Sequence, residues 1–289
     1  MNINEFADKV KKYVIEAGYE AQIQVVNKSN AVLTGVCIKR PGSNIGPNVY
    51  MEQFFGRFNN GENFEDLAKK ILEVAEANMK QSVDTTLFTN WDKAAKNVRP
   101  KLVPRKENES YLKDKVWTPF LDLAIVYRIE IPEMNADGGI AGVVVTQELL
   151  DKLGISPEEL DKVARENISD DIIFISMVEM FAGQLPRDAV EMMIAQNPMR
   201  ILTNSEKING AVQLLNPAAI EKVKVVIGNR FYIIPSSIHE VIILPPAMVP
   251  DESCLKDLIT NVNAEELDPE DILSDHAYLY ADGEFQSVA

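Results

Sequence analysis

Side chains able to carry acid–base chemistry gather in one short stretch of the chain, Ser236 to Glu240. One of only two histidines, His239, stands there beside Glu240 and close to Ser236 and Ser237. A serine hydroxyl, an imidazole and a carboxylate are the components of a hydrolytic triad. The serines lack the GxSxG elbow, however, and they lie between two expected strands rather than between a strand and a helix. We therefore expect them to hydrogen-bond nearby backbone in a turn, with His239 in a structural role.

The same histidine could also contribute to a metal site, together with Asp275 and His276. Two imidazoles and a carboxylate are donors that suit zinc or iron. Adjacent side chains of a strand point to opposite faces, so His239 and Glu240 could not both face one ion without a bulge. No HExxH or HxH spacing occurs. The sequence therefore predicts no metal site.

Cofactor and thiol chemistry have little support in the sequence. No GxGxxG or GxxxxGK motif is present, so no nucleotide or other cofactor is expected. The two cysteines, Cys37 and Cys254, lie far apart in unrelated contexts. Free, buried thiols in a reducing cytoplasm are the expected state, with a disulfide as the alternative.

Charge is distributed unevenly along the chain. The net charge is −15, and from Asp251 onward eleven carboxylates stand against the single Lys256, a net charge of −10. Such acidity opposes binding to duplex nucleic acid and to anionic membranes. One segment has the opposite bias and contains no acidic residue; its six cations are Lys93, Lys96, Arg99, Lys101, Arg105 and Lys106. These six are the candidate binding residues for an anionic partner, the alternative being a solvated edge.

Two apolar segments are predicted to form the central strands. Phe231–Ile234 and Ile238–Leu244, rich in branched and aromatic residues, flank a breaker at Pro235 and predict a hairpin. The run from Phe120 to Ile131 predicts one continuous strand that leaves a buried centre. Seven side chains should be buried in one sheet: Leu123, Ile125, Tyr127, Phe231, Ile233, Val241 and Ile243.

Helical periodicity and stop signals predict several helices around these strands. Ser156-Pro157-Glu158-Glu159 is a capping box with proline at the first helical position. Further helices are expected at residues 4–17, 49–58, 64–79, 89–97, 147–153, 188–194, 216–227 and 255–262. Hairpins followed by helices recur near Gln22, Phe120 and Phe231. The prediction is an α+β fold in which such units share one largely antiparallel sheet with helices mainly on one face.

Bulk composition sets limits on the class of protein. A hydrophobic content of 46% with 25% charged residues is typical of a globular protein, and no apolar run approaches the length of a membrane span. The N-terminal segment is interrupted by charges and predicts an amphipathic helix rather than a signal peptide. We expect a single integrated domain over residues 1–289, with two lobes, 1–118 and 119–289, as an alternative.

Several segments carry a resemblance to known sequences. They are GVCIKRPGSNIGPNVYMEQFF, FLDLAIVYRIEI, RILTNSEKINGA, FYIIPSSIHEVIILP and EDILSDHAYLY. Together they resemble a family of uncharacterised bacterial proteins, a domain of unknown function found mainly in anaerobic Gram-positive bacteria and their mobile elements. A weaker similarity links LAIVYRIEI and the segment that follows it to another uncharacterised family. The resemblance implies a bacterial, cytoplasmic protein with one integrated fold, and no activity.

The polar residues do not converge on a recognisable reaction, and the function is unknown at this point. The preferred hypothesis is a non-enzymatic module that binds a protein or peptide. A hydrolase using Ser237, His239 and Glu240 is the alternative, and a host-interaction factor of mobile elements is a third. The sequence does not indicate an oligomeric state.

Overall fold

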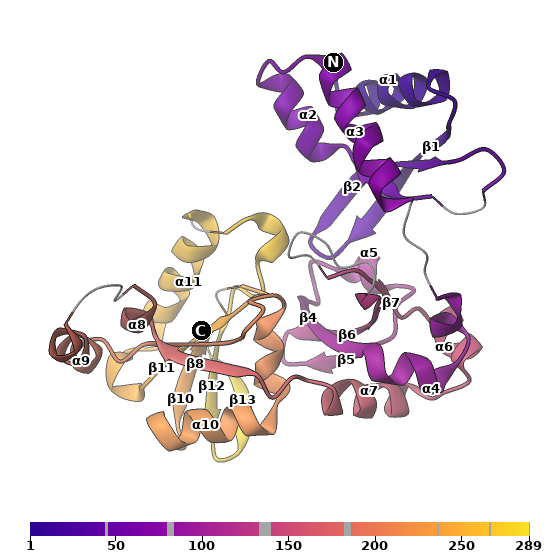
Figure 1. The fold of residues 1–289 in the computed structure, drawn as a ribbon. Coiled ribbons are helices and arrows are strands. Elements are labelled where there is room, and N and C mark those ends of the chain that lie inside the picture. Colours follow the sequence, from indigo (N-terminus) through magenta and orange to yellow (C-terminus); the bar gives the residue numbers. More distant parts are fainter. Residues whose placement is uncertain are drawn as a thin grey trace. The chain divides into compact units, whose positions relative to one another are not determined.

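The computed structural model describes residues 1–43, 46–79, 84–132, 140–181, 186–235, 237–265 and 267–288. The chain divides into two compact units (Figure 1). Unit 1 comprises Met1–Asp84 with Pro132–Gly139, and unit 2 comprises Thr85–Ile131 with Ile140–Ala289. This division does not coincide with the boundary after residue 118 that the sequence offered for two lobes.

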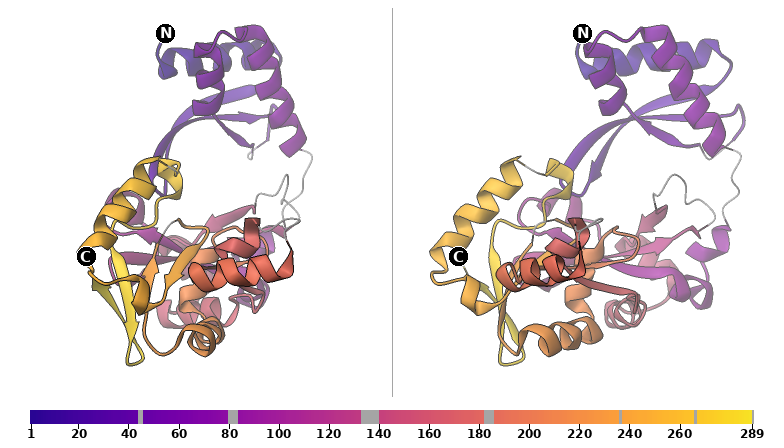
Figure 2. Two further views of the ribbon diagram at one scale, coloured as in Figure 1. Left: turned by 90° about the vertical axis from the view of Figure 1, so that its left-hand side faces the viewer. Right: turned by 60° about the vertical axis from the view of Figure 1, so that its left-hand side comes forward.

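Unit 1 is a three-stranded antiparallel sheet with its helices on one face (Figure 2). Its elements are α1 (Ile3–Glu16), β1 (Glu20–Lys28), β2 (Ala31–Lys39), β3 (Asn48–Tyr50), α2 (Glu52–Asn59) and α3 (Phe64–Asn78). Phe6 and Val10 of α1 pack with Ile38 of β2 and with Leu67 and Ile71 of α3. This apolar layer joins helices and sheet into a core that is separate from the clusters of unit 2.

Local signals in the sequence explain where the elements of unit 1 begin. Asn2 and Glu5 form a reciprocal capping box at the start of α1. The side chain of Asn63 accepts the backbone N–H groups of Glu65 and Asp66 at the start of α3. The expected helix at 49–58 begins later, because residues 48–50 pair with β2 instead.

Unit 2 contains two further antiparallel sheets. The first has the order β4 (Val98–Pro104), β6 (Leu123–Glu130), β5 (Trp117–Phe120), and β7 (Gly142–Val144) also pairs with β6. The second has the order β13 (Glu284–Val288), β12 (Ala277–Ala281), β10 (Phe231–Ile234), β11 (Val241–Leu244), β9 (Arg200–Asn204), β8 (Ile172–Ser176). The helices are α4 (Trp91–Ala94), α5 (Glu109–Leu112), α6 (Gln147–Leu153), α7 (Pro157–Glu166), α8 (Met177–Phe181), α9 (Arg187–Gln196), α10 (Pro217–Ile227) and α11 (Ser253–Glu265).

The predicted α+β class is confirmed, and every pairing between the described strands is antiparallel. The expectation of one shared sheet is wrong, because the strands within the described ranges form three sheets. The expectation that helices lie mainly on one face is also wrong for the six-stranded sheet, because both of its faces are covered. Alternate residues of β10 enter two different apolar clusters: Phe231 and Ile233 join the main core, whereas Tyr232 and Ile234 pack with Leu255 and Ile259 of α11.

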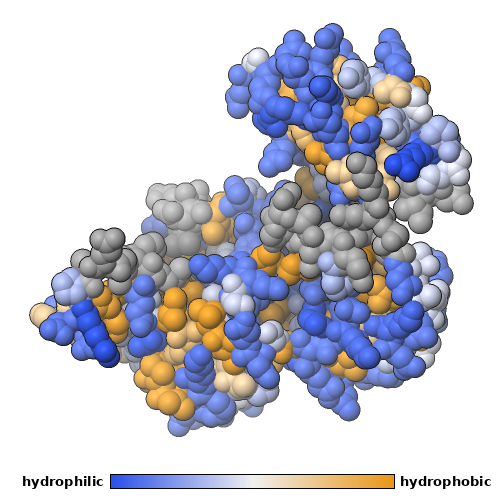
Figure 3. All heavy atoms as spheres, viewed as in Figure 1, coloured by the Kyte–Doolittle hydropathy of each residue, from blue (hydrophilic) through white to orange (hydrophobic). Residues whose placement is uncertain are grey.

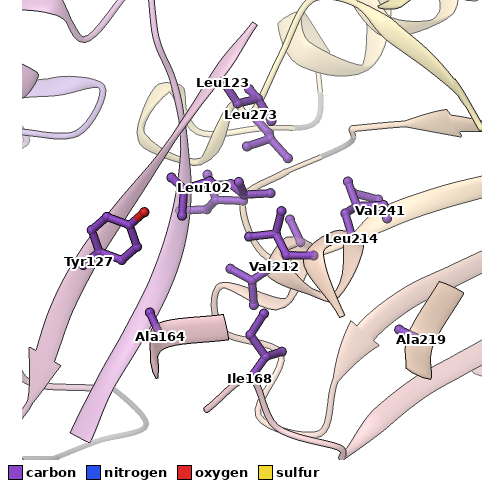
Figure 4. Close-up of a cluster of buried hydrophobic side chains, with 14 of the residues drawn as sticks. Leu102, Leu123, Tyr127, Ala164, Ile168, Val212, Leu214, Ala219, Val241 and Leu273 are labelled. Carbon is purple, nitrogen blue, oxygen red and sulfur yellow. The ribbon is translucent and has the colours of Figure 1, made fainter. Parts of the chain in front are cut away.

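One apolar core connects the two sheets of unit 2. All seven side chains predicted to be buried are fully buried and belong to this core, although they come from two sheets instead of one. Figure 4 shows part of it: Leu102, Leu123 and Tyr127 of the four-stranded sheet lie on one side, and Val241 of the six-stranded sheet on the other. Val212 and Leu214, from a 3-10 helix at Gly210–Leu215, lie between them.

The expected continuous strand at 120–131 is interrupted. Phe120 pairs with Leu123, so Leu121 and Asp122 form a two-residue turn between β5 and β6. Leu121 has a φ of +55°, a conformation that branched apolar residues rarely adopt. An apolar run gives no signal for such a turn, and the interruption places the Asp122 carboxylate at the end of a hairpin.

One face of unit 2 carries an apolar region in the view of Figure 3. Apolar atoms gather at the lower edge of the view in Figure 3, over α10, where Val225 is 84% exposed.

No helix in the described ranges combines the length and the apolar character needed to cross a bilayer.

Candidate functional site

The sequence predicted His239 within the second strand of the hairpin. In the structure it lies in the loop before β11. The Ser237 hydroxyl oxygen accepts the backbone N–H groups of His239 (3.0 Å) and Glu240 (3.3 Å). The Ser237 N–H in turn donates to the Glu240 carbonyl at 3.2 Å. A serine that curls the backbone in this way removes these residues from the strand ladder, so β11 begins at Val241. Ser236, the other candidate nucleophile, lies outside the described residues.

Both ring nitrogens of His239 contact protein atoms. Nδ1 accepts the backbone N–H of Asn209 at 3.2 Å, and Nε2 lies 3.1 Å from a carboxylate oxygen of Asp271. Because Nδ1 accepts, the neutral ring carries its proton on Nε2, which donates to Asp271. A general base needs a free nitrogen facing its substrate. In this geometry the imidazole joins two loops.

The neighbouring backbone reinforces that joint. The His239 carbonyl accepts the Thr203 hydroxyl at 2.7 Å, and the Ile238 N–H donates to the Asp271 carbonyl at 2.9 Å. A Cβ atom at Gly210 would lie 2.4 Å from the His239 carbonyl oxygen, so only glycine fits there. Ser237 and His239 therefore lie in a closely packed structural junction.

Asp275 and His276 do come together, in a cluster that the sequence analysis did not predict. Asp122 is at its centre: one carboxylate oxygen accepts the Tyr278 hydroxyl at 2.6 Å, and the other accepts the Ser274 hydroxyl at 2.6 Å. His276 Nδ1 lies 2.6 Å from Asp275 and 3.6 Å from Asp122. His239 pairs with Asp271 instead and is not part of this cluster.

One donor atom from each of Asp122, Asp275 and His276 lies within 4.8 Å of the others. Carboxylate oxygen and imidazole nitrogen could hold a divalent cation with water completing its shell. The donors, however, already satisfy one another, and Asp275 and His276 are 74% and 48% exposed. Burial raises the pKa of the Tyr278 hydroxyl well above its usual value, and the Asp122 charge adds to the rise. The cluster is thus a hydrogen-bonded joint between the β5–β6 turn and β12.

The six basic candidates do not share one surface. Lys93 and Lys96 lie on α4 and the 3-10 turn that follows it, and Lys93 Nζ donates to the Thr86 hydroxyl. Arg99 and Lys101 alternate with buried residues along β4. Arg105 and Lys106 follow that strand and are exposed. The segment therefore contributes to two separate concave sites in unit 2.

The first concave site, here called the basic groove, has a volume of about 530 Å³. Arg105 and Lys106 line it together with two cations beyond the basic segment, Lys113 and Lys115. The remaining lining residues are Glu109, Leu112 and Trp117. Trp117 on β5 is 37% exposed. The groove thus combines four cations and one carboxylate with an accessible indole.

The second site, here called the arginine pocket, has a volume of about 240 Å³ and lies where β4 and β6 meet the loop after β9. Arg99 and Arg128 line it with the carboxylates Glu130, Asp171 and Glu206. Its other lining residues are Pro100, Ile140, Ile168, Ser169, Asn204, Ser205, Ile208, Asn209, Val212 and Gln213. It therefore contains charges of both signs.

The two cysteines are not joined in a disulfide. Cys37 and Cys254 are both free, as expected, but neither is buried: Cys37 is half-buried and Cys254 is exposed. The expectation of buried thiols is wrong.

Comparison with known sequences identifies the family. The chain belongs to DUF5688, a family of unknown function, whose model matches residues 3–282. Searches of curated proteins and of solved structures each found no match. The fold and the two concave sites are therefore the basis on which function can be argued.

Proposed function

We propose that this DUF5688 protein is a binding module whose basic groove takes an acidic segment of a partner protein. The observation that carries the proposal is the gathering of Arg105, Lys106, Lys113 and Lys115 in one groove of a chain with a net charge of −15. Complementary charge favours encounter with the right partner and disfavours wrong ones.

Three of these cations are available to a partner. No ion pair engages the side chains of Arg105, Lys106 or Lys113 within the described parts of the chain. Lys115 differs, because its Nζ lies 2.5 Å from the Asp114 carboxylate and 5.4 Å from the centre of the Tyr111 ring. A carboxylate of a partner can therefore approach these exposed side chains without displacing an existing ion pair.

The groove also offers an apolar contact. Trp117 and Leu112 lie among the cations, and tryptophan and arginine are enriched among residues that dominate binding energy. A groove of about 530 Å³ accommodates several side chains of an extended or helical segment. An acidic segment with an apolar side chain between its carboxylates fits this combination.

The hydrolase alternative has less support. Ser237 accepts backbone N–H groups and both nitrogens of His239 are engaged, so a catalytic role would require these bonds to break. A host-interaction role in mobile elements is a special case of partner binding and needs no different site. We take the protein to act in a bacterial cytoplasm, where its free thiols would stay reduced.

The test is a titration followed by fluorescence anisotropy. The probes are short fluorescein-labelled oligoglutamate peptides with and without a central leucine, with an oligoserine peptide as reference. Lys106→Glu/Lys113→Glu should weaken oligoglutamate binding by about tenfold or more, because each reversal replaces an attraction with a repulsion.

Lys96→Glu/Lys256→Glu is the matched control, since it changes the net charge equally at exposed positions outside the groove. It should leave the affinity within about twofold. Equal loss in both double variants would mean that binding follows net charge and not the groove. No binding of either oligoglutamate peptide by the unmodified protein would overturn the proposal.

A further inference from the structure

In the arginine pocket, the pairing of β4 and β6 brings two like charges onto neighbouring strands. Arg99 of β4 and Arg128 of β6 are directly opposed in the antiparallel pairing. Opposed residues have their Cβ atoms about 4.5–5.5 Å apart on one face, where like charges are destabilising. The register of the sheet thus places both arginines on one face, where Arg99 Nη1 donates to the carbonyl oxygens of Lys96 (2.9 Å) and Val98 (2.8 Å).

The Arg128 side chain is largely buried, and one of its donors has no hydrogen-bond partner among the described residues. Its side chain is 13% exposed, its Nη2 donates to the Ile140 carbonyl at 3.1 Å and lies 3.3 Å from Glu130 Oε1. Its Nε is buried, with no hydrogen-bond partner in the described structure. A buried donor without a hydrogen-bond partner costs about 1–3 kcal/mol of folding free energy, and more if the group is charged. Burial and the nearby Arg99 charge both lower the pKa of Arg128, whereas Glu130 raises it.

Carboxylates face the same space and limit what could enter. Glu130 is half-buried, and burial raises its pKa. Glu206 lies exposed at the same site, and Asp171 accepts a hydrogen bond from the Ser205 hydroxyl. A phosphate or another compact anion would meet these three negative charges as well as the two arginines.

Neutral amides complete the lining in fixed orientations. Gln213 donates to the Ser169 carbonyl at 2.9 Å. Asn204 donates to the Ile208 carbonyl at 2.9 Å and accepts its N–H at 3.3 Å. A volume of about 240 Å³ is below the roughly 300–1,000 Å³ of sites for drug-sized ligands. Site size and fixed polar groups therefore point to a small polar molecule.

We propose that the arginine pocket binds a small zwitterion of amino-acid size, with its carboxylate at Arg99 and Arg128 and its ammonium at Glu130 and Glu206. The carboxylate relieves the repulsion between the opposed arginines, and two parallel N–H···O bonds suit a guanidinium. The ammonium places a positive charge among the acidic side chains. This ligand site is separate from the basic groove and does not depend on partner binding there.

The experiment measures thermal unfolding and calorimetric binding with free amino acids, each compared with its matched carboxylic acid and amine. Alanine, propionate and ethylamine form one such set, and inorganic phosphate tests a plain anion. At least one amino acid should bind and raise the unfolding temperature, about tenfold or more tightly than its carboxylic acid or its amine.

The variants are chosen at accessible positions because Arg128 itself is buried. Arg99→Gln and Glu206→Gln should each weaken that binding about tenfold or more, as expected for a lost charged hydrogen bond. Arg187→Gln, at an exposed position outside both concave sites, should leave it unchanged. The proposal is overturned if no amino acid binds, if propionate or phosphate binds as tightly, or if both pocket variants bind as the unmodified protein does.

Discussion

Single side chains in this protein are positioned mainly by contacts distant in sequence. Arg99 and Arg128 oppose each other because β4 and β6 are antiparallel neighbours, and Asp122 reaches Tyr278 because the two sheets of unit 2 share one core. His239 shows the same dependence, since its ring bridges Asn209 and Asp271. Residue type left catalysis open as an alternative to the structural role that we expected, and the contacts of both ring nitrogens favour the structural role.

We predict that His239→Gln lowers the free energy of unfolding by about 1 kcal/mol, the net value of one typical hydrogen bond. The glutamine amide can replace one of the two ring contacts but not both with the same geometry. Oligoglutamate binding at the basic groove should be unaltered. Urea unfolding and anisotropy on the same purified variant check both expectations.

An unchanged unfolding free energy together with lost function would contradict the structural role. It would return the residue to catalysis, where removing a general base typically lowers a rate by about 10²–10⁴-fold without unfolding the protein.

At the scale of elements, β10 and β11 are the two central strands of the six-stranded sheet and are heavily buried. Ile233 and Ile243 are directly opposed and have no exposed surface. We predict that Ile233→Ala costs about 2–5 kcal/mol of unfolding free energy, through lost burial and the cavity left behind. Val225→Ala on α10, an 84% exposed position, is the matched control and should change little. Comparable losses in the two variants would contradict the assignment of this core.

Many of the helices and strands were predictable from the sequence, because capping residues, glycine stops and branched residues are local signals. The capping residue Ser156 and the stop at Gly154 frame α6 and α7 as expected, and branched residues marked β10. The turn at Leu121 and Asp122 was not predictable, because leucine in a left-handed conformation leaves no sequence signal. Without this turn, no pattern in the sequence indicated that Asp122 lies beside Tyr278, so the cluster around them was not predictable. The groove cations Lys113 and Lys115 were not predictable from charge bias, because they follow the basic segment and alternate with acidic residues.

At the scale of the molecule, unit 2 contains several tyrosines that must stay protonated to remain buried. Burial raises the pKa of Tyr111 to about 12 and also raises the pKa values of Tyr127 and Tyr278. A raised pKa in the folded state means that the unfolded chain releases its protons first, near pH 10. We predict full tyrosine-linked stability below about pH 9, and a steady loss above about pH 10.

Urea midpoints measured from about pH 8 to about pH 11 test this expectation. Tyr278→Phe should be less stable at neutral pH, because Asp122 loses a hydrogen bond, but should have a shallower decline at alkaline pH. A midpoint that stays constant across the whole range would contradict it.

The acidity of the whole chain also predicts its behaviour toward nucleic acid. With a net charge of −15, we expect no appreciable binding of duplex DNA at physiological salt. A gel shift at micromolar protein with a steep salt dependence would contradict this, and Lys106→Glu/Lys113→Glu would then show whether the basic groove causes it.

The central claim, that the basic groove binds an acidic partner, is tested most directly by the fluorescence of Trp117. The chain has two tryptophans, and Trp91 lies outside the groove, where its indole N–H donates to Glu159. Trp91→Phe therefore leaves Trp117 as the sole indole reporter. Titration with an unlabelled oligoglutamate peptide should change the intensity or wavelength of its emission saturably, and added salt should reverse the change. Saturable anisotropy binding of the labelled peptide with no change in Trp117 emission would place the peptide elsewhere and contradict the account.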